Sequence, residues 1–117
     1  MCEPKPYWAP AMQREFHAEA FVVRGCRRPS ELDALIVAHR TTIVICDLES
    51  GPANVLAWLA SRQKAPIPTV ISGSSSTAGL EAVCRELGVW SFLPDLIPHN
   101  EIAALCRRWL RLLASPS

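Results

Sequence analysis

Apolar runs without polar alternation recur along the chain, and amphipathic segments separate them. The runs that read as strands are residues 20–24 (AFVVR), 43–46 (IVIC), 69–72 (TVIS) and 89–93 (VWSFL). Continuous apolar runs rich in β-branched residues are typical of strands that are covered on both faces. The pattern therefore predicts a parallel sheet buried between layers of helices.

The amphipathic segments predict helices between these strands. Ser30 and Asp33 have the spacing of a capping box at the start of one helix. Gly88 is a predicted left-handed C-cap of another, with Val89 packing back onto it. Strands that alternate with helices imply right-handed crossovers and an α/β fold of three layers. The predicted helices span residues 10–20, 30–39, 52–64, about 80–87 and 99–113.

Length and charge narrow the class of protein. A chain of 117 residues fits a single domain, and we expect it over residues 10–117 after a proline-rich tail at 1–9. The net charge of +1 gives no electrostatic reason to expect nucleic acid or a membrane surface as partner. No apolar run approaches the roughly 20 residues of a membrane helix, and the N-terminus does not resemble a secretory leader. We expect a cytoplasmic protein.

The cysteines and histidines indicate neither a metal site nor a catalytic thiol. The five cysteines are odd in number, and no CxxC pair or zinc-ligand spacing occurs. Three of them fall on predicted apolar faces and are expected in the core, whereas Cys2 and Cys26 are expected to be exposed. His17, His39 and His99 show no ligand spacing. The expected core cysteines are Cys46, Cys84 and Cys106.

Two polar features stand where predicted strands end. Asp47 follows the run IVIC and should emerge at the carboxyl edge of the sheet, where ligands collect in open α/β folds. Capping a turn is the more common role of an aspartate in this position. The hydroxyl-rich loop from Ser72 to Gly79 precedes a helix, so a small anion- or nucleotide-binding protein is an alternative. That loop lacks a Walker lysine and the GxGxxG spacing.

Three motifs suggest a family. TIVICD ends at Asp47, VISG places Ser72 before Gly73, and GVWSFL contains Phe92. In order and spacing they resemble the receiver domain of bacterial two-component response regulators, over roughly residues 10–113. The resemblance implies a flavodoxin-like sheet of four to five strands, with Asp47 in the place of the phosphoacceptor. It also implies that Ser72 and Phe92 occupy the two switch positions.

The departures from this family concern phosphoryl transfer. Receivers hold magnesium with two acidic residues after their first strand. Counting back from AFVVR, that strand would precede Met1, and only Glu3 remains as an acid. Asp95 stands where the family has a lysine. The resemblance therefore implies a degenerate receiver without cofactor, in which Asp47 is not phosphorylated. A strand ending in Asp-Asp upstream of Met1 would restore magnesium binding and an ordinary phosphoacceptor.

A degenerate receiver implies a non-catalytic signalling module that acts through protein contacts. The expected contact face comprises the last two helices and the strand between them, with Trp90, Arg107, Arg108 and Arg111 as anchors. A solvated helix surface is the alternative for the arginines, and Trp109 is expected in the core. The partner would be a histidine kinase or a second copy of the chain. Loss of the central first strand would expose an apolar edge, which favours a homodimer. The alternatives are direct pairing of AFVVR with TIVICD, or a short substitute strand from KPYWA.

Overall fold

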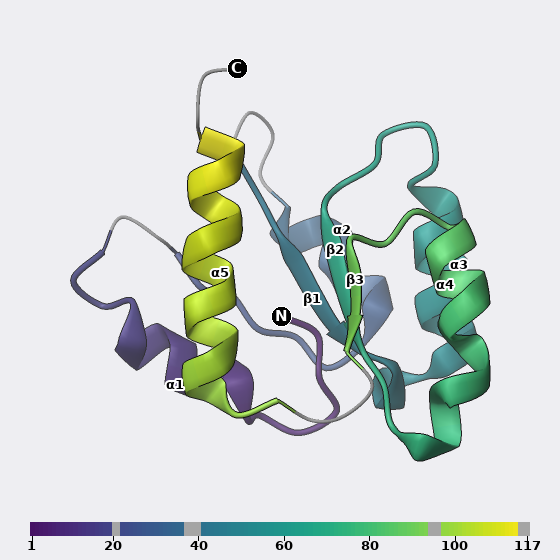
Figure 1. Cartoon of the computed structure of the whole chain (residues 1–117), viewed down its shortest axis with the longest axis horizontal. Coiled ribbons are helices and arrows are strands. Elements are labelled where there is room, and N and C mark those ends of the chain that lie inside the picture. Colours follow the sequence, from purple (N-terminus) through teal and green to yellow (C-terminus); the bar gives the residue numbers. More distant parts are fainter. Residues whose placement is uncertain (20–21, 37–40, 94–96, 115–117) are drawn as a thin grey trace.

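A parallel sheet lies at the centre of the protein (Figure 1). The structure, a computed structural model, describes residues 1–19, 22–36, 41–93 and 97–114. Strands β1 (Val44–Asp47), β2 (Thr69–Ser72) and β3 (Ser91–Leu93) pair in the order β1-β2-β3. The predicted α/β class and parallel pairing are thereby confirmed.

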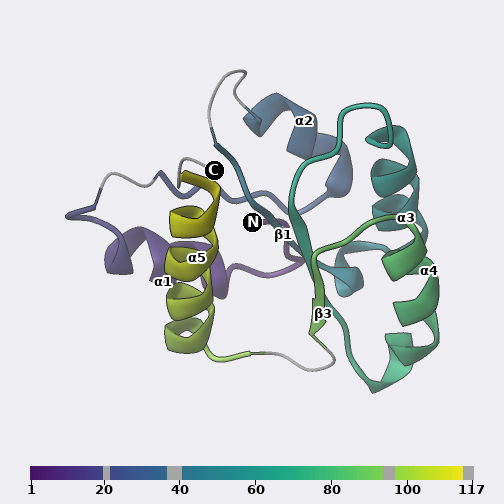
Figure 2. The same ribbon diagram turned by 45° about the horizontal axis from the view of Figure 1, so that its top comes forward.

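Helices cover both faces of the sheet (Figures 1 and 2). On one face lie α1 (Trp8–Glu15) and α5 (His99–Ala114), and on the other α2 (Leu32–Leu35), α3 (Pro52–Ser61) and α4 (Glu81–Glu86). No helix within the described residues is long and apolar enough to cross a membrane. Short 3-10 turns complete the helical segments: η1 (Pro29–Glu31), η2 (Leu48–Ser50) and η3 (Ser75–Leu80).

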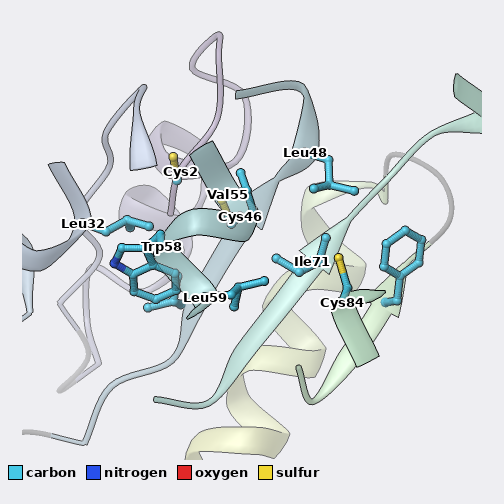
Figure 3. Close-up of a cluster of buried hydrophobic side chains, with 11 residues drawn as sticks. Cys2, Leu32, Cys46, Leu48, Val55, Trp58, Leu59, Ile71 and Cys84 are labelled. Carbon is cyan, nitrogen blue, oxygen red and sulfur yellow. The ribbon is translucent and has the colours of Figure 1, made fainter. Parts of the chain in front are cut away.

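Alternation along the strands divides the core into two clusters. Ile45 and Val70 face α1 and α5, where they pack with Trp8, Met12 and Ile102. The next residues of the same strands face the other way, toward α3 and α4 (Figure 3). Strand residues are therefore buried on both faces, as their continuous apolar runs predict. The second cluster includes Cys2, Cys46, Leu48, Val55, Trp58, Leu59, Ile71, Cys84 and Phe92.

Residues 1–3 lie beside β1, on the edge away from β2. The Cys2 amide donates to the Ile45 carbonyl at 2.8 Å, and the Asp47 amide donates to the Cys2 carbonyl, also at 2.8 Å. Cys2 thereby forms a parallel bridge with Cys46. A single bridge at Cys2, within the described residues, therefore lies in the place of the strand that was expected before Met1. The apolar edge that favoured a homodimer is covered by the chain itself.

A second segment pairs with the outer side of residues 1–3. The Cys26 amide donates to the Met1 carbonyl at 2.9 Å, and the Glu3 amide donates to the Cys26 carbonyl at 3.0 Å. Residues 22–25 form no strand, so the strand predicted at 20–24 is wrong for its described part; residues 20–21 lie outside the described residues. The pairing is a single bridge at Cys26.

The helix predicted over residues 30–39 is shorter, and its cap differs. The Glu31 carboxylate accepts the Arg28 amide at 3.1 Å, so the capping residues lie ahead of the predicted Ser30 pair. Asp33 instead accepts the indole N–H of Trp58 at 2.9 Å. α2 ends at Leu35, and residues 37–40 lie outside the described residues. The predicted capping box is therefore wrong.

The remaining helices follow their predictions more closely. α3 buries Val55, Trp58 and Leu59 on one side, and α5 begins at His99 as expected. Gly88 has a φ of +87°, which confirms the predicted left-handed position after α4. The Val89 amide donates back to the Cys84 carbonyl at 3.4 Å, a bond typical of a Schellman ending.

Candidate functional site

Asp47 ends β1 at the carboxyl edge of the sheet, where its half-buried carboxylate caps a turn. Its Oδ1 accepts the Glu49 amide at 2.9 Å and begins the 3-10 turn η2. Burial raises the pKa of Asp47, and the carboxylates of Glu49 and Glu3 add to that effect, whereas the bond from the Glu49 amide opposes it. Asp47 thus caps a turn, the more common role for an aspartate in this position, and it lies at the carboxyl edge of the sheet.

Ser72 lies next to Asp47 in the neighbouring strand. The two residues are register partners in the β1–β2 pair, and Ser72 is fully buried. The following residue, Gly73, donates its amide to the Leu93 carbonyl at 2.7 Å. The structure therefore brings together the two residues that the sequence places at phosphoacceptor and switch positions.

Phe92 is buried beneath the turn that follows Ser72. A Cβ added at Gly73 would come within 2.7 Å of the Phe92 ring carbon Cζ and within 2.9 Å of the Thr77 hydroxyl. Separations below 3.0 Å force a neighbour to move, so this turn needs glycine to let the ring approach the backbone. Phe92 belongs to the cluster on the α3 and α4 face.

Glu3 is a buried acid whose role the sequence analysis missed. Its Oε1 accepts the amides of Tyr7 and Trp8 at 3.0 and 2.9 Å, and its Oε2 accepts the amide of Ala9 at 2.9 Å. These are donors that the start of a helix leaves without intrahelical partners. Glu3 therefore ties residues 1–3 to α1. The sequence feature that could have revealed this role is an acid ahead of an apolar helix, although its spacing is not that of a capping box.

The hydroxyl-rich loop after β2 is engaged by a carboxylate. The hydroxyls of Ser74 and Ser76 donate to Glu49 Oε1 at 3.0 and 3.3 Å. The Ser74 amide donates to the Thr77 hydroxyl at 2.7 Å. An anion at this loop would compete with the negative charge of Glu49 for the same donors. The arrangement therefore gives no support to the anion-binding alternative.

Arg107 has internal partners. Its guanidinium contacts Glu19 at 2.7 Å and Glu15 at 3.3 Å, and it lies 4.8 Å from the centre of the Phe16 ring. The hydrogen bond to Glu19 raises the pKa of Arg107. These contacts join α5 to α1 and the residues after it. These internal contacts therefore do not favour Arg107 as an anchor for a partner.

The other expected contact residues are at the surface. Trp90 leaves 47% of its surface exposed, just before β3, and Arg108 and Arg111 are exposed on α5. Trp109 is half-buried and packs against the core on the α1 and α5 face, near its expected place. Asp95 falls outside the described residues, so its place relative to Asp47 stays a prediction.

Three cysteines form a row across the central segments. Cys2 pairs in register with Cys26 on one side and Cys46 on the other, and all three thiols are free. The prediction that Cys2 is exposed is wrong, since it is completely buried, whereas Cys26 is half-buried. Because the three are widely spaced in sequence, only the pairing of the segments could reveal the row.

The thiols of this row shift one another's pKa. The hydrogen bond from Cys46 lowers the pKa of Cys2 to about 7, against the opposing effect of burial. The same bond raises the pKa of Cys46. Burial and the charge on Cys2 raise the pKa of Cys26 to about 12. Negative charge in the row is therefore most stable on Cys2.

A hollow of about 480 Å³ lies near the amino end of β1, and Asp47 is not among its lining residues. Among the described residues, no group of histidines, cysteines or acids is arranged to hold a metal ion. No protein-family model matches the chain, and no curated protein matches it in sequence. The resemblance to receiver domains therefore depends on the sequence motifs, and these comparisons do not identify that family.

Proposed function

We propose that this chain is a receiver-like signalling module that does not accept a phosphoryl group and acts through protein contacts. Two features of one observation carry the proposal. Asp47 and Ser72 are register partners at the carboxyl edge of the sheet, and the Glu3 carboxylate is bound by backbone amides at the start of α1. The first feature matches the resemblance to receivers. The second removes Glu3, the acid that remains near the place of the family's acidic pair, from any role in binding magnesium.

The order of the paired segments supports a flavodoxin-like fold. Counted along the chain, residues 1–3 are first, Cys26 second, and β1, β2 and β3 follow. Their spatial order is then second, first, third, fourth and fifth. This is the strand order of flavodoxin-like proteins. In this proposal, the two single bridges are the remnants of two strands, so the sheet has five positions.

The chemistry of phosphoryl transfer explains why we expect no reaction at Asp47. Transfer to a carboxylate depends on cations that neutralise the charge spread over the phosphoryl oxygens. Magnesium prefers carboxylate and water ligands in octahedral geometry. Both oxygens of Glu3 already accept backbone amides. Binding magnesium through Glu3 would leave the buried amides of Trp8 and Ala9 without partners, which is costly.

Phosphorylation tests this proposal. The protein is incubated with acetyl phosphate and magnesium, and its intact mass is measured beside an active receiver domain as positive control. We expect no mass increase, because no group of acids in the described residues is arranged to hold a cation beside Asp47. Beryllofluoride, a stable mimic of the phosphoryl group, should leave the amide resonances of Ser72 and Gly73 in place. A phosphoryl mass that is lost in Asp47→Asn would contradict the proposal and favour a working phosphoacceptor.

The proposed contact face comprises α4, β3 and α5, with Trp90, Arg108 and Arg111 as its anchors. Tryptophan and arginine contribute most often to binding hot spots. The proposed partner is a histidine kinase or a second copy of the chain. Sedimentation equilibrium distinguishes these two, with Trp90→Ala as the test variant and Tyr7→Ala as a matched exposed aromatic. Association weakened only by Trp90→Ala supports a second copy, and a strict monomer excludes it.

A further inference from the structure

The row Cys26, Cys2 and Cys46 has a feature that the signalling proposal does not use. Adjacent members of the row are register partners on neighbouring segments, so their side chains leave the sheet on the same face. Segments paired in this way lie about 4.8 Å apart. That separation falls in the range of about 4.4–6.8 Å between the Cα atoms of disulfide-linked cysteines. Figure 3 shows Cys2 and Cys46 in this cluster.

The three thiols differ in their access to solvent. Cys2 and Cys46 are completely buried, whereas Cys26 is half-buried at the outer end of the row. A reagent from solution therefore meets Cys26 first. The three thiols lie in a row. Among the described residues, no group of cysteines, histidines or acids is arranged to bind a metal ion. The geometry of the row suits exchange between neighbouring sulfurs better than coordination of one ion.

Three arginines flank the accessible thiol in the sequence. Arg24, Arg27 and Arg28 are all exposed and lie within two residues of Cys26 in the sequence. Burial and the charge on Cys2 are the main causes that raise the pKa of Cys26; the charge of Glu31 adds to them, and the Met1 ammonium opposes them. An anionic reagent should be attracted to these exposed arginines.

We propose that Cys26 is a site of thiol–disulfide exchange with an anionic disulfide of the glutathione class, and that Cys2 is its resolving thiol. In the first step, the Cys26 sulfur attacks one sulfur of the external disulfide. The external S–S bond breaks, and the departing thiolate takes up the proton that Cys26 loses. Cys26 is left in a mixed disulfide.

In the second step, the Cys2 sulfur attacks the Cys26 sulfur of the mixed disulfide. The bond between Cys26 and the external group breaks, and the second external thiolate leaves with the proton of Cys2. The net reaction oxidises two protein thiols to one disulfide and reduces one external disulfide to two thiols. Cys2 suits the resolving role because its lowered pKa keeps a fraction of it as thiolate, the reactive form.

Cys46 is the competing partner, and the geometry does not favour it. It lies on the far side of Cys2 from the accessible Cys26, with Cys2 between them. Its thiol is also completely buried, so a reagent from solution does not reach it. The expected product is therefore the Cys2–Cys26 disulfide, which joins residues 1–3 to the segment that ends at Cys26. This reaction does not depend on the proposed signalling role.

Exchange with oxidised glutathione tests the proposal on the folded protein near pH 8. Intact mass and peptide mapping without reductant should show a transient adduct of about 305 Da on Cys26, followed by a net loss of about 2 Da. The linked peptide should join Cys2 to Cys26. Cys2→Ser should stop at the adduct, and Cys26→Ser should show neither product. Cys84→Ser, a buried cysteine outside the row, should behave as wild type.

The time course of the wild-type protein decides the proposal even if a variant fails to fold. A stable adduct on Cys26 without the later loss of mass would overturn the resolving role of Cys2. A different linked pair, or reaction only after unfolding in denaturant, would overturn the proposed site.

The anionic preference has a separate test. The double variant Arg27→Gln, Arg28→Gln should react with oxidised glutathione at least about threefold more slowly, because steering of charged reagents depends on such cations. Its reaction with neutral hydroxyethyl disulfide should be unchanged. Arg85→Gln, an exposed arginine on α4, serves as the control. An unchanged rate with oxidised glutathione, or equal slowing with both reagents, would overturn the role of the arginines.

Discussion

The two halves of the sheet are held together in different ways. The β1–β2 pair has four consecutive register partners, from Val44 with Thr69 to Asp47 with Ser72. Residues 1–3 join β1 and Cys26 through single bridges, and the carboxylate of Glu3 fixes them to α1. The first half depends on a continuous ladder within a buried core. The second depends on a few hydrogen bonds from one short segment, so it should respond to single polar substitutions.

The largest expected loss of stability is in the ladder. Ile71 is fully buried in β2 between its two neighbouring strands. Ile71→Ala should lower the free energy of unfolding by about 2–5 kcal/mol, because it removes buried methyl groups and leaves a cavity. Val22→Ala, at a position with 66% exposure, should change it by less than about 0.5 kcal/mol. Urea unfolding of both variants measures the difference; similar losses would contradict the assigned burial.

The next largest effect should come from the N-terminal half. Glu3→Ala removes three hydrogen bonds from the start of α1 and leaves the buried amides of Trp8 and Ala9 without their partner. We expect a loss of about 2–3 kcal/mol. Glu86→Ala, an exposed acid at the end of α4, is the matched control and should be nearly neutral. If both variants unfold at the same urea concentration, Glu3 does not anchor this segment.

The turn between the ladder and η3 should show a smaller, steric effect. Gly73→Ala places a Cβ against the Phe92 ring and should cost about 1–3 kcal/mol. Phe92→Leu removes the ring that causes the clash, so the two substitutions should be less harmful together than the sum of their separate costs. A double-mutant cycle measures this coupling. Strict additivity would show that the ring is not what requires glycine at position 73.

The smallest expected effect is electrostatic and depends on pH. Burial raises the pKa of Asp47, so the folded state binds its proton more tightly than the unfolded state, whose pKa is about 3.9. Stability should therefore fall as the pH rises through the interval from about 3.9 to the raised value, and stay lower at neutral pH.

Asp47→Asn removes this penalty and keeps a side-chain oxygen for the Glu49 amide. At pH 7 it should stabilise the protein by less than about 1 kcal/mol, because the half-exposed carboxylate is screened by solvent. The gain should disappear at about pH 3, where the carboxyl is protonated in both states. Thermal unfolding at both pH values checks the sign, and a gain that grows toward low pH would contradict it.

Local patterns predicted the ladder well, because its information is in consecutive residues. The runs that contain Val44 and Val70 are apolar and β-branched, and both are strands. The run at 20–24 has the same composition, yet residues 22–24 are not a strand, since propensity alone does not supply a pairing partner. Residues 1–3 show no apolar run, and their pairing partners, Cys26 and Cys46, are distant in the sequence. No local pattern could have revealed them.

The candidate site was predictable to the same degree. Asp47 and Ser72 end their strands where the motifs placed them, because each position follows from a local run. The role of Glu3, the internal partners of Arg107 and the burial of Cys2 depend on contacts with distant segments. Local sequence patterns do not report such contacts, so these features were mispredicted or missed.

Hydrogen exchange measures most directly whether residues 1–3 complete the sheet. The amides of Cys2 and Asp47 donate across this junction, so they should exchange slowly, at rates comparable with those of β2 amides such as Val70. Exposed Arg27 serves as a reference position in the same sample. Protection of Cys2 and Asp47 close to that of Val70 is the predicted result. Exchange of both amides as fast as Arg27 would contradict a sheet completed by residues 1–3, and with it the proposed receiver-like order.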